Sequence, residues 1–467
     1  MDTTPASPLA RFRAELYQSV LGLRRDALFE TLDVVLGGEG PTSLVRHSLS
    51  PVCRRGWAAV CDALAEGSLD LRALGRLFAQ MMPEALVVGR LLWVVDGSIW
   101  PRPEAKTSSE RTWGRFITAG TPESGIVGAW EYQWLVAIPE ASGSWALPLA
   151  VDRRGPQAGT ATTLAIRQLR AAQAARPPLA PRPVLLLDSH YDVVALVQAA
   201  LGIDILARLA ANRRFYRRPG PYRGRGARPK HGPVFRCAEP STHGRPDRTQ
   251  CAADPVFGTV TIDVWERLHT QPAAQVELSV IRVTLGRLAR RETPPRPLWL
   301  VWHGGALPTD LRTCQHWYQR RFAVEHAFRF LKQALGWTTI RPRAPTVADR
   351  WSRLLAAALW ELWLARTLVA EQRLPWERAV GAYRSPGQVR RGFGRLLLGL
   401  GTPARPLDCA ESRPAASAGS ARDRHPAFRC SGVAHPRPPN RRSSPIAAPH
   451  RPAPARRIAP VCPNSRV

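Results

Sequence analysis

The chain has 467 residues, of which 45% are apolar, so it can hold two or three domains with real cores and is not a wholly disordered protein. Its 66 lysines and arginines against 36 acidic residues give a net charge of +30, which favours a polyanionic partner, nucleic acid before membrane. Only three residues are lysine, so GC-rich codon usage is an equally simple source of part of the arginine excess.

Other classes of protein fit the sequence poorly. The N-terminal residues show no secretory signal, and the most apolar run, LLAAALWELWLARTLVA, carries Glu361 and Arg366 where a membrane span would be apolar. The eight cysteines form no C-x-x-C pair, which disfavours a zinc site or a disulfide framework. We therefore expect a cytoplasmic protein without a membrane segment.

Residues 1–85 are predicted to form a helical N-terminal domain. FRAELYQSVLGLRRDALFETLDVVL, RRGWAAVCDALAEG and DLRALGRLFAQMM repeat apolar residues at steps of three and four. Such a domain is a natural place for DNA binding, although no helix in it shows a clear recognition face.

Residues 86–211 change to short apolar runs. The predicted order is strand, strand, strand, helix, strand, helix, strand. These elements are expected, in turn, at VVGRLLWVVDGSIW, IVGAWEYQWLVAIPE, SWALPLAVDRR, ATTLAIRQLRAAQAA, PVLLLDSHYD, VVALVQAAL and GIDILARLAA. This order predicts the first part of an α/β core with a mixed sheet.

Residues 212–305 are predicted to be a basic loop followed by a β-rich insertion, with strands at GTVTIDVW, QVELSVIRVTL and RPLWLVWHG. Helical periodicity returns within residues 306–402, which would complete the core. Residues 403–467 are rich in proline and arginine and lack apolar periodicity, so they are predicted to be disordered. A frameshifted terminus is an alternative interpretation of this tail.

Two aspartates follow separate buried strands, Asp96 in LLWVVDG and Asp188 in VLLLDSH. The edge of a sheet beyond its strand ends is where α/β proteins place their sites, and carboxylates there can share a metal ion. Each aspartate alone is more often a turn or helix-capping residue.

A third carboxylate lies in YQRRFAVEHAFRFLK, residues 318–332. If this stretch is one helix, Tyr318, Arg321, Glu325 and Lys332 project from a single face. A phenol, a guanidinium and an ammonium beside an acid suit a DNA phosphate held next to a metal ligand. A solvated charged face with i,i+4 ion pairs is the structural alternative.

The spacing Tyr, two residues, Arg, three residues, Glu, six residues, Lys resembles the signature of DDE transposases of bacterial insertion sequences, family four or the closely related family 701. The resemblance extends over about residues 11–402 and implies a ribonuclease-H-like catalytic core with a β-rich insertion. It implies Asp96, Asp188 and Glu325 as the catalytic, metal-binding triad, with two Mg²⁺ or Mn²⁺ ions. It also implies that Tyr318, Arg321 and Lys332 bind DNA phosphates, and Arg329, one turn after Glu325, is a plausible fourth.

The activity implied is cut-and-paste transposition: cleavage of double-stranded DNA at terminal inverted repeats, then transfer of the freed strand into target DNA by a homodimer at the nucleoid. The basic loop would add phosphate contacts, with its aromatic residues available for stacking. The cationic residues predicted for this DNA-binding loop are Arg213, Arg214, Arg217, Arg218, Arg223, Arg225, Arg228 and Lys230.

Two other functions remain open from the sequence. A catalytically inactive transposase remnant could bind the ends as a repressor, which the unusual tail favours and the intact triad disfavours. A ribonuclease-H-fold nuclease would cleave without dependence on terminal sequence.

Overall fold

The computed structural model begins with short helices, three of which have a side-chain cap. Asp70 accepts hydrogen bonds from the backbone N–H groups of Arg72 and Ala73, and so caps the helix that follows it. The helices of this segment are α1 (Pro8–Glu15), the π-helix η1 (Leu16–Val20), α2 (Arg25–Gly37), α3 (Leu44–His47), α4 (Trp57–Glu66) and α5 (Leu71–Gln80). Helices therefore make up much of the segment that was predicted to be a helical N-terminal domain.

The structure describes most of the chain up to residue 406. The described residues are 7–38, 40, 43–83, 89–116, 125–178, 180–222, 224, 226–286, 296–377 and 384–406. They belong to one compact unit.

The central layer is a mixed sheet of twelve described strands. Its strands are β1 (Leu92–Pro101), β2 (Thr112–Phe116), β3 (Gly125–Ile138), β4 (Leu147–Arg154), β5 (Val184–Leu187), β6 (Asp204–Arg208), β7 (Arg214–Tyr216), β8 (Val234–Arg236), β9 (Arg248–Asp254), β10 (Gly258–Thr270), β11 (Ala273–Leu285) and β12 (Leu298–His303). The predicted order of strands and helices from β1 to β6 is confirmed, with β2 as an additional strand.

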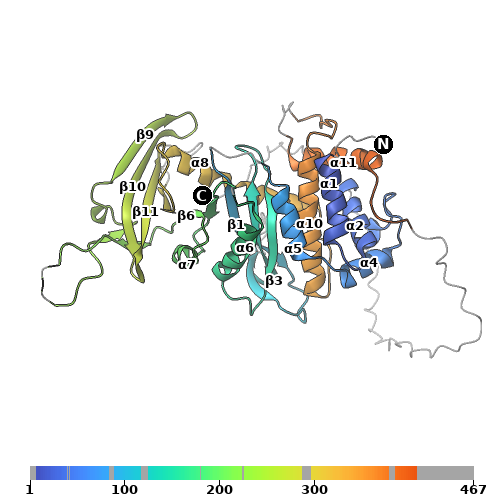
Figure 1. The fold of residues 1–467 in the computed structure, drawn as a ribbon, viewed down its shortest axis with the longest axis horizontal. Helices are drawn as coiled ribbons and strands as arrows, with labels where there is room; N and C mark the ends of the chain where they lie inside the picture. The colour runs from blue at the N-terminus through green and yellow to red at the C-terminus, as the bar shows by residue number, and fades with distance from the viewer. Residues whose placement is uncertain are drawn as a thin grey trace, which may run out of the picture. The chain divides into compact units, whose positions relative to one another are not determined.

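The strand order is β2-β3-β1-β5-β6-β12-β11-β10-β7-β8, with β4 paired to β3 and β9 to β10. β1 runs antiparallel to β3 and parallel to β5, and β5 runs parallel to β6. The strands predicted for the β-rich insertion continue the same sheet, because β12 pairs antiparallel with β6. Figure 1 shows them at the end of the molecule away from α1, α2 and α11.

The remaining helices are α6 (Ala161–Ala175), α7 (Val193–Gln198), α8 (Arg312–Arg320), α9 (Ala323–Gln333), α10 (Pro345–Ala365) and α11 (Pro386–Leu400), and a short 3-10 turn, η2, spans Pro240–Thr242. α10 packs on β4 and also contacts α1, α2, α4 and α11, as Figure 1 shows. The apolar run predicted not to span a membrane lies, as far as Ala365, in α10, where most of its residues are buried. In the described part of the chain no helix is long and apolar enough to cross a membrane.

Most of the tail predicted to be disordered lies outside the described residues. Its first residues, 403–406, contact the helices around α2. Arg405 donates its backbone N–H to Asp26 over 2.8 Å, and Ala404 is buried.

A buried ionic cluster joins the first helices to α10. Arg13 on α1 donates hydrogen bonds to Glu361 on α10 over 2.5 Å and to Asp33 on α2 over 2.8 Å. Burial raises the pKa of Glu361 to about 7, because desolvation outweighs the attraction of Arg13. Burial also raises the pKa of Asp33.

Replacement of Glu361 by Gln is expected to flatten the pH dependence of stability. A carboxyl with a raised folded-state pKa stabilises the protein below its unfolded pKa of 4.5, and that contribution is lost as the pH rises through 7. The wild type should lose about 3 kcal/mol more unfolding free energy across this window than Glu361→Gln does. Urea unfolding at pH 4.5 and pH 8 measures the difference, with the exposed Glu371→Gln as control. Equal pH dependence in the wild type and Glu361→Gln would contradict the assignment.

Candidate active site

Asp96 lies on β1, and Asp188 directly follows β5, the strand that pairs parallel with β1. The register pairs Val94 of β1 with Leu186 of β5, and each aspartate follows its member of that pair by two residues. Since side chains alternate along a strand, both carboxylates leave the sheet on the same face. Burial raises the pKa of Asp96, and the nearby charge of Asp188 adds to this rise. The structure therefore brings the two predicted aspartates together.

The prediction that a strand ends at Asp96 is wrong in one respect. β1 continues to Pro101, because its antiparallel pairing with β3 persists to the Pro101–Ala129 pair. Only the parallel pairing with β5 stops, at Val94. Asp96 thus lies at the point where one neighbouring strand ends and the other continues.

Residues 318–332 do not form one continuous helix. α8 ends at Arg320 and α9 begins at Ala323. Around the junction, backbone N–H groups bond three residues back, from Arg321 to the carbonyl of Tyr318 and from Glu325 to that of Phe322. This tightened turn changes the spacing of side chains around the axis from the uniform 100° that was predicted.

Arg321, at this junction, lies between two of the predicted catalytic carboxylates. Its Nη1 is 2.6 Å from Asp96 Oδ2, and its Nη2 is 3.7 Å from Glu325 Oε1. Burial raises the pKa of Asp96 to about 6, and the charge of Arg321 opposes that rise. Glu325 is about half exposed, so the cluster opens to solvent on the side of α9.

The other predicted phosphate-binding residues occupy different surroundings. Tyr318 is buried, and its hydroxyl is close enough to Arg321 for a hydrogen bond that lowers the phenol pKa against the larger rise due to burial. The Lys332 ammonium lies 5.7 Å from the centre of the Trp337 ring, and burial lowers its pKa. Arg329 is exposed, and its charge lowers the pKa of His326.

Two residues next to Asp188 were not assigned a role from the sequence. His190 Nδ1 lies 2.7 Å from Asp188 Oδ2, and the His190 ring is largely exposed. Tyr191 is buried, and after burial itself the charges of Asp96 and Asp188 contribute most to its raised pKa. Both residues belong to the DSHYD stretch, and their proximity to Asp188 in the sequence was the available signal.

The donor set suits a hard divalent cation. Three carboxylates come from β1, the residue after β5, and α9, and oxygen ligands of this kind are those that Mg²⁺ and Mn²⁺ prefer. In the arrangement seen here, no three acidic, histidine or cysteine residues among those described converge as metal ligands. Arg321 holds Asp96 instead, so the residues fit a metal ion once the guanidinium gives up this carboxylate.

Replacement of Arg321 by Gln is expected to tighten Mn²⁺ binding by about tenfold, because the variant removes a cation that competes for Asp96 and Glu325. Titration of the DNA-free protein with Mn²⁺, followed by electron paramagnetic resonance, measures the change. Lys332→Gln removes a cation that lies over Trp337 and is expected to leave the affinity unchanged. Weaker Mn²⁺ binding by Arg321→Gln would show that Arg321 organises the carboxylates for the metal.

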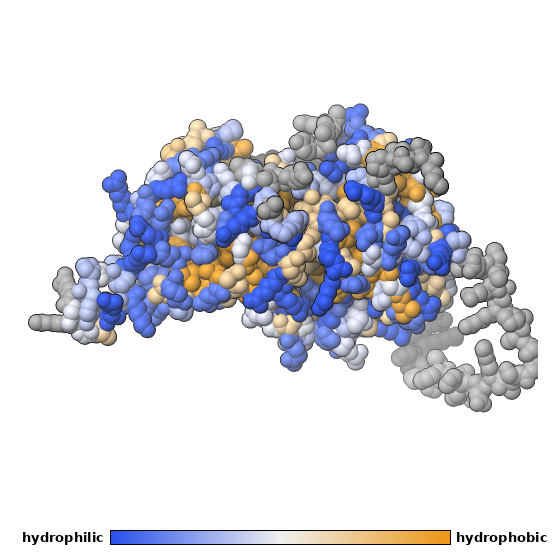
Figure 2. Space-filling model, viewed as in Figure 1, coloured by the Kyte–Doolittle hydropathy of each residue, from blue (hydrophilic) through white to orange (hydrophobic). Residues whose placement is uncertain are grey.

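The predicted DNA-binding loop is only partly free for phosphate. Arg217 donates to the His243 carbonyl over 2.6 Å, Arg218 pairs with Glu277, and Arg228 lies over the Tyr222 ring. The exposed cations are Arg213, Arg214, Arg218, Arg228 and Lys230, whereas Arg223 and Arg225 lie outside the described residues. Figure 2 shows a largely hydrophilic surface over the insertion strands.

The expectation that the loop's aromatic residues are available for stacking is wrong for Phe215 and Phe235, and Tyr216 is half-buried against the His231 ring. Phe215 and Phe235 are buried at the paired centres of β7 and β8, and Tyr222 is the exposed one. The Phe215 and Phe235 side chains point inward because alternate residues of a strand face the core. Trp299 and Trp302 of β12 are also buried.

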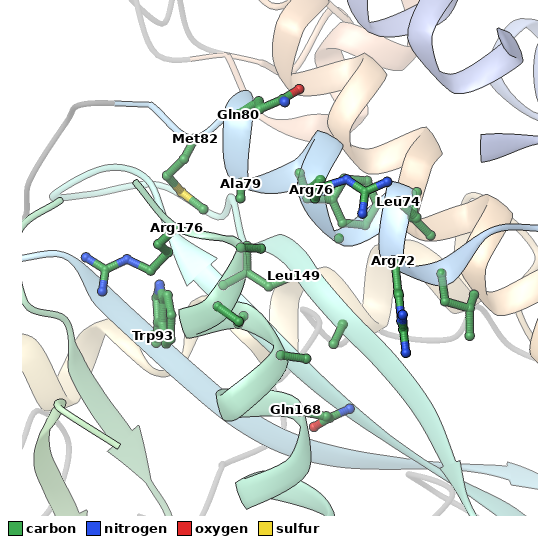
Figure 3. A pocket seen from close by; sticks show the side chains of 18 of the residues that line it. Arg72, Leu74, Arg76, Ala79, Gln80, Met82, Trp93, Leu149, Gln168 and Arg176 are labelled. Carbon is green, nitrogen blue, oxygen red and sulfur yellow. The ribbon is translucent and has the colours of Figure 1, made fainter. Parts of the chain in front are cut away.

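A separate pocket of about 1110 Å³ lies on the other face of the sheet (Figure 3). Trp93 lines it, and since Trp93 is an odd number of residues from Asp96, the two side chains leave β1 on opposite faces. The walls are mainly apolar residues of α5 and α6, with Arg72, Arg76 and Arg176 nearby. None of the predicted catalytic residues is among its described lining residues.

Comparison with known proteins agrees with this geometry. A family model described as DDE superfamily endonuclease matches residues 15–267, more than half of the chain. The matched region includes Asp96 and Asp188 and ends before Glu325. The inclusion of Glu325 in the candidate site therefore depends on its ion pair with Arg321, which also pairs with Asp96. No curated protein matches the chain.

Proposed function

The chain belongs to the DDE superfamily of endonucleases, and we propose that it is a transposase that cuts DNA at the ends of an element and joins them to target DNA. The observation that carries this proposal is that Arg321 pairs with both Asp96 and Glu325, while the charges of Asp188 and Glu325 add to the rise in the pKa of Asp96 caused by burial. Carboxylates this close are costly unless a cation neutralises them, so the cluster is built for positive charge.

The topology supports the finer assignment of a ribonuclease-H-like core. The order β4-β3-β1-β5-β6 combines three antiparallel strands with two parallel ones, and α6 and α7 make the connections to β5 and β6. The Tyr318, Arg321, Glu325 and Lys332 spacing supports insertion-sequence family four or 701 within the superfamily.

Asp96, Asp188 and Glu325 would hold two Mg²⁺ or Mn²⁺ ions. When bound, such ions activate an attacking oxygen and stabilise a leaving oxygen in phosphoryl transfer. The chain itself supplies position and charge. Arg321, once free of Asp96, can bind a DNA phosphate together with the Tyr318 hydroxyl.

The substrate proposed is double-stranded DNA, first at terminal inverted repeats and then at a target site. The net charge of +30 supports binding to DNA and association with the nucleoid. We further propose a homodimer in the active complex, since two ends must be cut together, and the helical N-terminal domain as a further DNA contact.

Cleavage of DNA that carries the sequences flanking the gene tests the proposal. The transposase should cut this DNA in Mg²⁺ and leave a shuffled sequence of the same length intact. Equal cleavage of both would identify a ribonuclease-H-fold nuclease instead. Tight end binding without cleavage by the wild type would identify an inactive remnant that acts as a repressor.

Replacement of Lys332 by Arg is expected to lower cleavage by roughly three- to tenfold although the charge is kept. A compact ammonium over the Trp337 ring can act as a point charge on phosphate, and a planar guanidinium requires a different position. Initial rates on the flanking-sequence DNA measure the effect, and Arg341→Lys, at a largely exposed position, is the control. Full activity of Lys332→Arg would remove Lys332 from the site.

A further inference from the structure

A groove of about 980 Å³ begins directly beside Asp188. Ser189 and His190 line its near end, and Arg213 and Arg214 line its far end. One wall is α7 and the other is the insertion, where α7 packs against β11 (Figure 1). The groove thus leads from the candidate active site to the base of the basic loop.

The groove carries unpaired positive charge. Arg208, Arg213 and Arg214 line it, and in the part of the chain that the structure describes none of them pairs with a carboxylate. The acidic lining residue Asp192 is already used, because it accepts the N–H groups of Val194 and Ala195 as the cap of α7. The charge therefore remains available for an anion.

A polar atom in the groove also lacks a partner. The Thr270 hydroxyl, at the turn between β10 and β11, is buried without a hydrogen bond in the described structure. A buried hydroxyl in this state is costly, and rotation of the Thr270 side chain toward the groove would let a ligand acceptor satisfy it.

The groove also has apolar lining residues. Leu209, Leu278 and Val301 contribute to the floor. Flat apolar groups can rest on such a floor while phosphates meet the arginines at the rim. A groove of this volume has room for a ligand of a few nucleotides.

We propose that this groove binds the unpaired DNA strand that leaves the cleavage site. The inference rests on the proposed function in that the strand is produced at Asp96, Asp188 and Glu325. It adds a preference for single-stranded over double-stranded ends, set by Arg213, Arg214 and Thr270.

Binding of fluorescein-labelled oligo(dT) 12-mer and of a mixed-sequence 30-base-pair duplex, both in EDTA, tests the proposal by anisotropy. Arg213→Gln/Arg214→Gln should weaken oligo(dT) binding by about tenfold more than duplex binding, and should reduce the salt slope for oligo(dT) by about 1.4. The matched variant Arg228→Gln/Lys230→Gln removes equal charge outside the groove lining and should weaken both DNAs by the same factor.

Thr270→Val provides a second variant of nearly unchanged volume, and it should lower oligo(dT) affinity severalfold with duplex affinity kept. Equal losses for both DNAs in Arg213→Gln/Arg214→Gln would overturn the proposal. The binding assay does not depend on cleavage. If the wild type fails to cut DNA but binds oligo(dT) preferentially through these arginines, the transposase assignment is refuted and the proposal for the groove stands.

Discussion

Asp96→Asn, Asp188→Asn and Glu325→Gln are each expected to abolish Mg²⁺-dependent cleavage while leaving DNA binding largely intact. Each variant removes one negative charge from a cluster in which Arg321 already compensates two carboxylates. Loss of a metal ligand should lower the cleavage rate by at least about 1,000-fold, which corresponds to about 4 kcal/mol of transition-state stabilisation. Single-turnover rates on the flanking-sequence DNA, with binding measured in Ca²⁺, separate the two effects.

Asp192→Asn is the matched control. Asp192 also lies in the DSHYD stretch, but its carboxylate caps α7. Asn caps a helix about as well as Asp, so this variant should cut at nearly the wild-type rate. Retained cleavage in any one of the three triad variants would remove that residue from the catalytic set.

Trp337→Ala is expected to lower the free energy of unfolding by about 3–5 kcal/mol, the usual cost of a large cavity in a core. Trp337 is fully buried, and its ring contacts Trp134 at 5.3 Å and Phe328 at 6.2 Å between centroids. Its indole N–H donates to the Ser352 hydroxyl over 2.8 Å. Guanidinium unfolding monitored by far-ultraviolet circular dichroism measures the loss.

The same cluster positions the candidate catalytic helix. Trp134 pairs with Asp96 across β3 and β1, and Phe328 lies one turn after Glu325 on α9. Loss of Trp337 should therefore also reduce cleavage at temperatures where the variant is folded. Trp376→Ala, at an exposed tryptophan, should leave both stability and cleavage unchanged. A cost below 1 kcal/mol for Trp337→Ala would show that this cluster does not hold α9.

The core strands could be predicted because each has a strong local signal. VLLL and LLWVV are continuous apolar runs, and their burial in the sheet centre requires that composition. The short strands β7 and β8 were missed, since three residues with an arginine at one end carry little periodicity. Whether β12 belongs beside β6 depends on pairing between distant segments, which no local pattern records.

The residues of the candidate site could be predicted from the sequence better than the contacts between them. Residues that follow parallel strands must meet at one edge, which brought Asp96 and Asp188 together. The ion pair of Arg321 with Asp96 spans more than two hundred residues of sequence and could not be predicted from spacing. The buried Arg13–Glu361 pair was equally hidden, because each residue alone looks like a surface charge.

The joining reaction tests the central claim most directly. A DNA fragment bearing both flanking ends of the gene is incubated with the full chain, Mg²⁺ and a circular target, and the products are sequenced. The account predicts that the 3′ ends of the fragment become joined to the target, and that Asp96→Asn yields no joined product. Cleavage at internal positions without any joined ends, in the presence of both ends and metal, would contradict it.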